Sequence, residues 1–353
     1  MTHTHFFLGA NSAEGFYGLY DGLLDAPLRD IGILKGGAGC GKSTLMRRVA
    51  EAMAERGQDA VFIHCSGDPD SLDAVIFPTV RAALVDGTAP HALEPRYMAA
   101  RERYVDFSPC YDLAAARAAA PELTACADAY RAAYGRAYHA LRALGSIEAE
   151  RRALTREGFD EGKLLRRAEG IAARELKGRG EGRTARVFLG GLTAQGMLER
   201  FDSVQALCPR VYELCDSCAL AAPMLRLLHR AALEAGEDVL LCPDPLRPAL
   251  PRHLLLPGRG VAFVTAGRES AGRPYRRLRI DAMAEEKLTR AQKAHLRFLR
   301  RLRRELEGEA VDALARASCG HEAFEVLYRP CVDFSRVDAL CEAEAARMVS
   351  CLG

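Results

Sequence analysis

The 353-residue sequence lacks a large excess of charge of either sign, because 49 lysines and arginines are matched by 47 aspartates and glutamates. The formal net charge of +2 gives no reason to expect nucleic acid or an anionic membrane as a partner. A run of about 18 apolar residues, long enough to cross a bilayer, is also missing. With 49% hydrophobic and 27% charged residues, the composition is that of an ordinary soluble globular protein.

The N-terminus lacks the features of a secretory signal. Residues 1–5 contain neither a basic region nor the start of an apolar core. We therefore expect a cytoplasmic protein whose 12 cysteines are reduced thiols. At about 150 residues per domain, the length predicts roughly two domains.

A glycine-rich stretch provides the strongest motif of the chain. It fits the pattern G-x-x-x-x-G-K-[ST] and comprises Gly36, Gly37, Ala38, Gly39, Cys40, Gly41, Lys42, Ser43 and Thr44. Residues 31–34 before it form a short apolar run typical of a buried strand, and residues 45–53 after it have helical periodicity. Strand, glycine loop and helix are the arrangement of the phosphate-binding loop. We therefore predict a P-loop NTPase-like α/β fold.

The motif assigns a role to several side chains. Lys42 is expected to reach the β- and γ-phosphates of ATP, and Ser43 to hold Mg²⁺ through its hydroxyl. Asp86 ends the apolar run 82–85, as the Mg²⁺-binding aspartate of a Walker B strand does, although a turn aspartate before Gly87 is the alternative. The predicted catalytic residues are Lys42 and Asp86, the predicted metal ligands are Ser43 and Asp86, and the cofactors are ATP and Mg²⁺.

The first half of the chain recurs in the second half at an offset of 181 residues. Phe7, Leu8, Gly9, Ala13, Gly15 and Asp21 match Phe188, Leu189, Gly190, Ala194, Gly196 and Asp202. After a slip of two residues, Pro78 matches Pro257, and residues 105–106 resemble residues 280–281. One order of strands and helices is therefore predicted twice, in mainly parallel sheets, with a helical segment after each copy.

This internal duplication predicts four segments. Residues 1–110 form a nucleotide-binding α/β unit, residues 111–184 a helical insertion ending in a glycine-rich linker, residues 185–281 a degenerate α/β unit, and residues 282–353 a helical segment. The helical segments are candidate surfaces for a protein partner. The basic run Arg297, Arg300, Arg301, Arg303 and Arg304 alternates with leucines, which favours a solvated helix face over nucleic-acid contact.

The second copy lacks the residues that carry the predicted chemistry. At the offset of 181, Pro223 and Met224 stand where Lys42 and Ser43 stand, and proline has no N–H to offer a phosphate. Thr265 replaces Asp86 at the offset of 179. We therefore predict that the second copy binds no nucleotide.

Three further aspartates, Asp68, Asp70 and Asp73, follow the strand expected at residues 60–63. Turn chemistry and function remain equal alternatives for Asp68 and Asp70. The two histidines of this region, His64 and His91, are interpreted as structural.

A C-x-x-C pair, Cys215 and Cys218, lies in the second copy. With Cys208 and Cys242 it could form a four-sulfur zinc site, although a single pair is a weak signal.

Several stretches resemble a known family, the uncharacterised bacterial tandem P-loop ATPases. They are residues 5–11 (HFFLGAN), 15–21 (GFYGLYD), 35–46 (KGGAGCGKSTLM), 64–68 (HCSGD), 86–91 (DGTAPH) and 328–334 (YRPCVDF). The resemblance covers most of the chain and is strongest over the first 91 residues. It implies a nucleotide-binding ATPase. Members carry a P-loop in both halves, and this sequence departs from that pattern in its second half.

Three functions are compatible with these residues. The leading one is Mg²⁺-dependent ATP hydrolysis in the first half beside a non-binding second half. Many P-loop ATPases place a glutamate beside the Walker B aspartate, whereas Gly87 and Thr88 follow Asp86 here. Hydrolysis is therefore expected either to be slow or to need a residue from a partner. The alternatives are a small-molecule or nucleotide kinase, and a nucleotide-gated interaction module without turnover.

Overall fold

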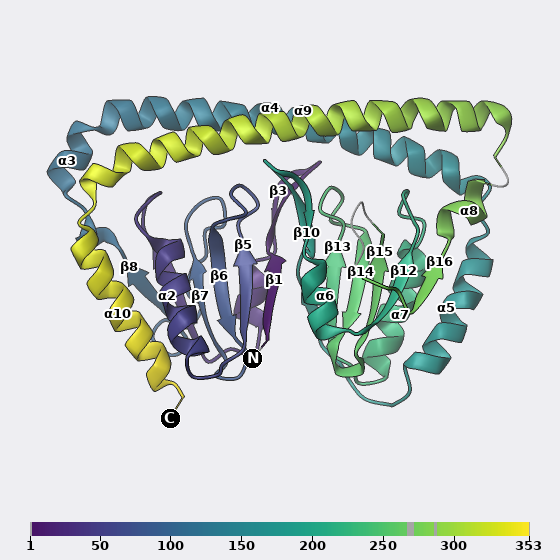
Figure 1. The fold of residues 1–353 in the computed structure, drawn as a ribbon, viewed down its shortest axis with the longest axis horizontal. Helices are drawn as coiled ribbons and strands as arrows, with labels where there is room; N and C mark the ends of the chain where they lie inside the picture. Colours follow the sequence, from purple (N-terminus) through teal and green to yellow (C-terminus); the bar gives the residue numbers. More distant parts are fainter. Residues whose placement is uncertain (1, 267–271, 286–287, 353) are drawn as a thin grey trace.

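Two six-stranded sheets lie side by side in the computed structural model, which describes residues 2–266, 272–285 and 288–352 (Figure 1). The first sheet has the order β1 (His3–Phe7), β5 (Ala60–His64), β6 (Leu72–Phe77), β7 (Ala82–Asp86), β4 (Asp30–Lys35) and β8 (Glu102–Asp106). Only β6 runs antiparallel to its neighbours in it. The neighbouring strands β4 and β7 are apolar runs of the sequence, buried on both faces as parallel strands usually are.

The second sheet repeats this order and these directions. Its strands are β9 (Thr184–Arg186), β13 (Val239–Pro243), β14 (Pro251–Leu256), β15 (Val261–Thr265), β12 (Arg210–Leu214) and β16 (Arg276–Leu278). The α/β class, the mostly parallel sheets and the duplicated layout are thereby confirmed. One predicted match is wrong: Ile280 and Asp281 begin helix α8 (Ile280–Glu285), and β16 is the counterpart of β8 because both pair beside the glycine-loop strand.

The remaining short elements also occur in pairs. Hairpins β2–β3 (Gly9–Ser12, Gly15–Gly18) and β10–β11 (Gly190–Thr193, Gly196–Glu199) follow the first strands, and helices α1 (Asp21–Asp25) and α6 (Phe201–Leu207) follow the hairpins. The repeated Gly15 and Gly196 have φ of +106° and +97°, a backbone conformation that favours glycine in these turns.

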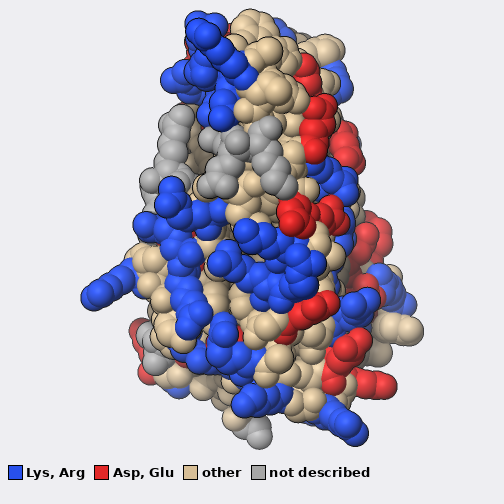
Figure 2. All heavy atoms as spheres, turned by 90° about the vertical axis from the view of Figure 1, so that its right-hand side faces the viewer, with Lys and Arg blue, Asp and Glu red and all other residues tan. Residues whose placement is uncertain are grey.

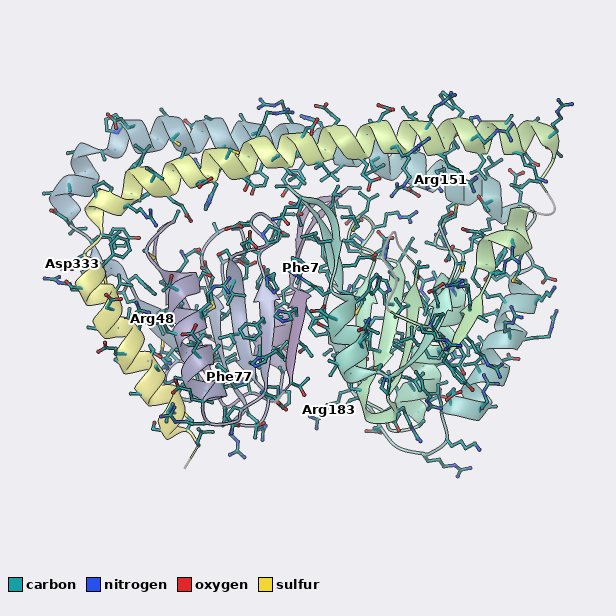
Figure 3. The ribbon with its side chains drawn as sticks, in the orientation of Figure 1. Phe7, Arg48, Phe77, Arg151, Arg183 and Asp333 are labelled. Atoms are coloured by element: carbon teal, nitrogen blue, oxygen red, sulfur yellow. The ribbon has the colours of Figure 1, made fainter. Side chains whose placement is uncertain are left out.

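The two copies join through their repeated Phe-Leu-Gly segments. Phe7 and Phe188 exchange backbone hydrogen bonds of 2.9 and 2.8 Å, and both rings are fully buried in one core cluster. Phe7 lies between the two sheets (Figure 3). Asn11 reinforces the junction, because its side-chain amide donates to the carbonyl oxygen of Leu192 in the other copy.

Two long helices span both copies. Helix α4 (Ala120–Arg156) follows η1 (Ser108–Cys110) and α3 (Leu113–Ala118), and helix α9 (Arg290–Tyr328) packs antiparallel along it across both sheets (Figure 1). The arginine run is largely solvated, while Leu296 and Leu299 are buried, as the amphipathic pattern predicts. Among the described residues, no helix combines the length and apolarity that spanning a membrane would require.

Each copy is covered by the helix that follows the other copy. Helix α5 (Glu161–Glu175) comes after the first sheet in sequence but packs on α7 (Ala222–Glu234) of the second, and Leu164 shares a core cluster with Leu225. Helix α10 (Phe334–Ser350), which follows η3 (Arg329–Cys331), packs on α2 (Lys42–Ala54) of the first. There Val337 shares a core cluster with Val49.

An ion pair also joins α10 to the first copy. Arg48 of α2 lies 2.7 Å from Asp338 of α10, on the side where the two helices face each other (Figure 3). Residues 178–182, predicted as a linker, run along the end of α7, where the N–H groups of Gly180 and Gly182 donate to carbonyl oxygens of Glu234 and Leu233.

We predict that separating the chain between residues 180 and 181 leaves neither half able to fold alone, because residues 2–180 lack α10 and residues 181–352 lack α5. Co-expressed halves should associate into one complex, since each donates the helix that buries the other's apolar face. Size-exclusion chromatography and urea unfolding of each half and of the pair measure this. A soluble first half that unfolds cooperatively by itself would contradict the exchange.

Candidate functional site

The glycine loop of the first copy connects the end of β4 to the start of α2. Gly39 and Gly41 have φ of +68° and +95°, in the left-handed region. A Cβ added at Gly36 would lie 2.7 Å from the Cys40 sulfur and 2.8 Å from Phe107 Cβ. The loop therefore needs glycine both for its conformation and for its close packing. Helix α2 begins at Lys42, directly after the loop.

Lys42, the first residue of α2, folds back over the loop. Its Nζ donates to the carbonyl oxygens of Gly36 and Gly37 at 2.9 and 2.8 Å. It also lies 3.5 Å from Asp86 Oδ2, and the two side chains are only 10% and 13% exposed. The structure thus brings the two predicted catalytic residues together, because β7 is the parallel neighbour of β4.

The other predicted binding residues lie around this lysine. Ser43 occupies the first turn of α2, and its hydroxyl oxygen accepts a hydrogen bond of 3.0 Å from the Leu72 N–H. Ala38 is half-buried in the loop and Thr44 is exposed on the helix. Asp86 Oδ1 accepts from the N–H and the hydroxyl of Thr88, which fixes the carboxylate at the end of β7.

A buried polar chain next to Asp86 was not predicted from the sequence. Tyr20 donates to Asp73 Oδ2 at 2.6 Å, His91 Nε2 lies 3.5 Å from Asp73 Oδ1, and His91 Nδ1 lies 3.0 Å from the Asp86 carbonyl oxygen. Burial lowers the pKa of His91, but the hydrogen bond and charge of Asp73 and the charge of Asp86 outweigh it, so the net pKa is raised. One feature of the sequence could have indicated this polar chain: Arg252 stands in the second copy where Asp73 stands in the first.

The neighbouring aspartates and His64 have structural partners. Asp68 Oδ1 accepts from the Asp70 N–H within an exposed turn. His64 Nδ1 donates to the Pro69 carbonyl oxygen at 2.8 Å, and its Nε2 accepts from His5 Nδ1 at 3.0 Å. Burial, with the charge of Arg200, lowers the pKa of His64 to about 4.

Residues outside the first α/β unit cover the glycine loop. The Gly37 N–H donates to the hydroxyl oxygen of Tyr111 at 2.8 Å. A Cβ on Gly39 would lie 3.1 Å from Glu325 at the end of α9, and one on Gly41 would lie 3.0 Å from Val337 on α10. Helices α9 and α10, which follow the second copy in sequence, therefore contact the loop of the first.

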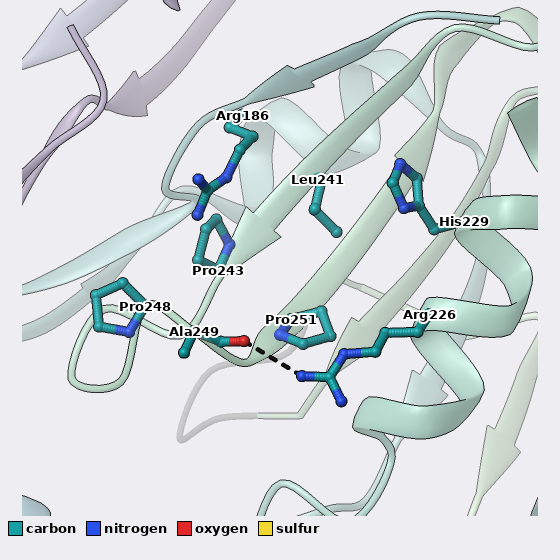
Figure 4. Close-up of a pocket in the computed structure, with 8 residues that line it drawn as sticks. All are labelled: Arg186, Arg226, His229, Leu241, Pro243, Pro248, Ala249 and Pro251. Carbon is teal, nitrogen blue, oxygen red and sulfur yellow. Dashed lines mark hydrogen bonds between the residues drawn. The ribbon is translucent and has the colours of Figure 1, made fainter. Parts of the chain in front are cut away.

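The structure corrects the register of the second copy. Arg226 donates to the Ala249 carbonyl oxygen (Figure 4), which repeats the bond from Arg47 to the Asp70 carbonyl oxygen at an offset of 179. The buried residues of the two helices follow the same offset: Leu45, Met46, Val49 and Met53 correspond to Met224, Leu225, Leu228 and Ala232.

Ala221 and Ala222, rather than Pro223 and Met224, therefore stand for Lys42 and Ser43. The offset of 181 fails because the second copy is shorter before α7. The predicted loss of both functional side chains still holds, and Thr265 ends β15 where Asp86 ends β7.

The shorter loop of the second copy closes on a carboxylate of its own. Asp216 accepts from the N–H groups of Cys218, Leu220 and Ala221 at 3.2, 3.0 and 2.7 Å. Burial raises the pKa of Asp216 despite these three donors. Because Asp216 already takes these N–H groups, they have no free hydrogen to offer a phosphate.

The four cysteines of the zinc hypothesis do not meet. Cys208 and Cys242 are buried in the core cluster around the Phe7–Phe188 junction, whereas Cys218 belongs to the cluster under α7. Within the part of the chain that the structure describes, no group of three His, Cys, Asp or Glu residues could hold a metal. A predicted nucleotide-bound Mg²⁺ is not affected, since it needs only one or two carboxylates besides phosphate and water.

Comparison with known proteins found no matching family model, curated protein or solved structure.

We predict that Asp216→Ala lowers the free energy of unfolding by at least about 2 kcal/mol, because it leaves buried N–H groups without an acceptor. Asp68→Ala is the matched control: it removes an exposed turn carboxylate and should cost less than about 1 kcal/mol. Urea unfolding followed by circular dichroism measures both. Equal losses in the two variants would contradict the role of Asp216.

Proposed function

We propose that the chain binds Mg-ATP at residues 36–44 and hydrolyses it slowly, while the second copy binds none. The main support is the pairing of Lys42 with Asp86 above a glycine loop in one copy, and its replacement in the same fold by Ala221 and Thr265. The loop geometry supports a phosphate ligand, because left-handed glycines and a helix start provide backbone N–H groups and positive potential.

Lys42 provides the charge for the triphosphate. In the structure its ammonium group has two neutral carbonyl acceptors and one carboxylate at 3.5 Å. Phosphate oxygens are stronger acceptors than carbonyl oxygens, since charge-assisted hydrogen bonds are about twice as strong as neutral ones. ATP binding would therefore move Lys42 from Gly36 and Gly37 to the β- and γ-phosphates.

Ser43 and Asp86 are the residues that would hold Mg²⁺. Their hydroxyl and carboxylate oxygens are the hard ligands that this ion prefers, and their present partners are N–H and hydroxyl groups that a metal could replace. When bound, the ion would neutralise charge that develops on the phosphates during attack by water.

A nucleotide-gated interaction module is supported by a separate observation. Tyr111 hydrogen-bonds to Gly37, and Glu325 and Val337 approach Gly39 and Gly41, so a ligand entering the loop meets the exchanged helices. Nucleotide binding would then change how α9 and α10 lie on the first copy. In this case ATP binds tightly without turnover.

If the chain hydrolyses ATP at this loop, Lys42→Ala should lower steady-state phosphate release from Mg-ATP by roughly tenfold to hundredfold, because a charged hydrogen bond contributes about 1.5–3 kcal/mol. Because Lys42 is largely buried and donates to two loop carbonyl oxygens, circular dichroism and urea unfolding of the variant should first show that its fold is that of the wild type. Lys163→Ala, which changes an exposed lysine on α5, is the control and should keep the wild-type rate. Equal rates in wild type and Lys42→Ala would refute hydrolysis at this site.

A further inference from the structure

The second copy contains an arginine-lined cavity beside the start of α7, just after its closed loop. The cavity has a volume of about 360 Å³ and lies between the end of α4, the start of α5 and one face of α7. Arg152 and Arg156 of α4 and Arg226 and Arg230 of α7 line it, with Glu161 as the single acidic residue. Lysines and arginines gather on this end of the molecule (Figure 2).

The positive charge of this cavity is not balanced by its own carboxylates. Arg156 pairs with Glu161 at 2.9 Å, and Arg230 lies 3.9 Å from Glu234. Arg226 donates to the Ala249 carbonyl oxygen, which carries no full charge. Among the residues that the structure describes, neither Arg152 nor Arg226 forms an ion pair with a carboxylate, although the charge of Asp216 partly offsets that of Arg152.

Arg152 is the group with the strongest need for an anion. Its Nε is buried and has no hydrogen-bond partner among the described residues. Burial lowers its pKa, and the charges of Arg247, Arg156 and Arg226 lower it further. Arg247, which does not line the cavity, pairs with Asp244 through Nη2 at 3.4 Å and leaves its buried Nε and Nη1 without a partner in the described chain. A bound anion would satisfy both the hydrogen bonds and the charge.

At two of the four arginine positions the first copy has the opposite charge. Asp160 and Asp333 cap helices α5 and α10, and Arg152 and Glu325 each lie eight residues before these caps. Arg230 corresponds in the same way to Glu51, at the offset of 179 that the helices share. Arg152 and Arg230 are therefore specific to the second copy, whereas Arg226 and Arg156 stand where the first copy has Arg47 and Arg329.

We propose that this cavity binds a small molecule that carries at least two phosphate groups. Guanidinium groups match phosphate oxygens in paired hydrogen bonds, and the volume lies in the range of small-ligand sites. A second cavity of about 240 Å³ shares Arg226 and adds Arg186 and His229 (Figure 4). This site is independent of ATP binding at Lys42.

The test uses inorganic pyrophosphate and the full chain with Lys42→Ala, which removes the competing loop. Calorimetric titration at about 0.15 M salt should give one saturable site. Adding Arg152→Gln or Arg226→Gln should weaken binding roughly tenfold to hundredfold. Arg167→Gln, which changes an exposed arginine on α5 outside the cavity, is the control and should leave binding unchanged. Arg152→Gln should fold, because it removes a buried unpaired charge.

Three outcomes would overturn the proposal. The first is no saturable binding tighter than about 1 mM. The second is equal binding by the Arg152→Gln variant and its control. The third is tighter binding of a single-stranded oligonucleotide, or of vesicles with anionic phospholipid, than of pyrophosphate, with the binding lost in the Arg152→Gln and Arg226→Gln variants. That result would assign the arginines to a nucleic acid or to a membrane surface.

Discussion

The burial of α2 by α10 and of α7 by α5 is the packing constraint on which the rest of the structure depends. The apolar residues of α2 face the first sheet and, through Val49, the buried Val337 of a helix almost 300 residues later in sequence. Burying one such side chain contributes about 1.5–3 kcal/mol, so several of them decide whether a copy is stable. Helix α4 carries the chain from the first copy to α5 on the second, and helix α9 carries it back to α10 on the first.

This exchange gives the second copy a structural role in the molecule. The second α/β unit holds α5, orients the long helices and returns α10 to the first copy, where Val337 lies beside Gly41. Its own loop no longer needs a ligand, because Asp216 supplies an internal carboxylate to the N–H groups that remain. The backbone groups of the two loops thus have different partners. In the first copy, Lys42 donates to the carbonyl oxygens of the glycine loop. In the second, the buried Asp216 accepts from the loop N–H groups.

Much of the fold was predictable because it is local in sequence. The apolar runs predicted the strands, the periodicity after Lys42 predicted α2, and Asp86 was placed correctly at the end of a strand. The internal repeat predicted the duplicated order. Each of these signals involves residues close together in the chain or a comparison of the chain with itself.

The remaining features depend on contacts between distant residues. No local pattern indicates that α5 packs on the second copy and α10 on the first. Tyr20 and His91 meet Asp73 only when three separate segments fold together. The register of the second loop was misplaced because Cys218 and Ala221 carry no motif that reveals a shorter loop closed by Asp216.

The measurement that tests the central claim most directly is the number of nucleotides bound per chain. Equilibrium dialysis with a non-hydrolysable ATP analogue and Mg²⁺ should use the Arg152→Gln, Arg226→Gln chain, so that the arginine-lined cavity does not contribute. The account predicts one nucleotide per chain, none after Lys42→Ala, and still one after Ala221→Lys, because Asp216 and the alanines keep the second loop closed. Two nucleotides per chain, or one that survives Lys42→Ala, would contradict it.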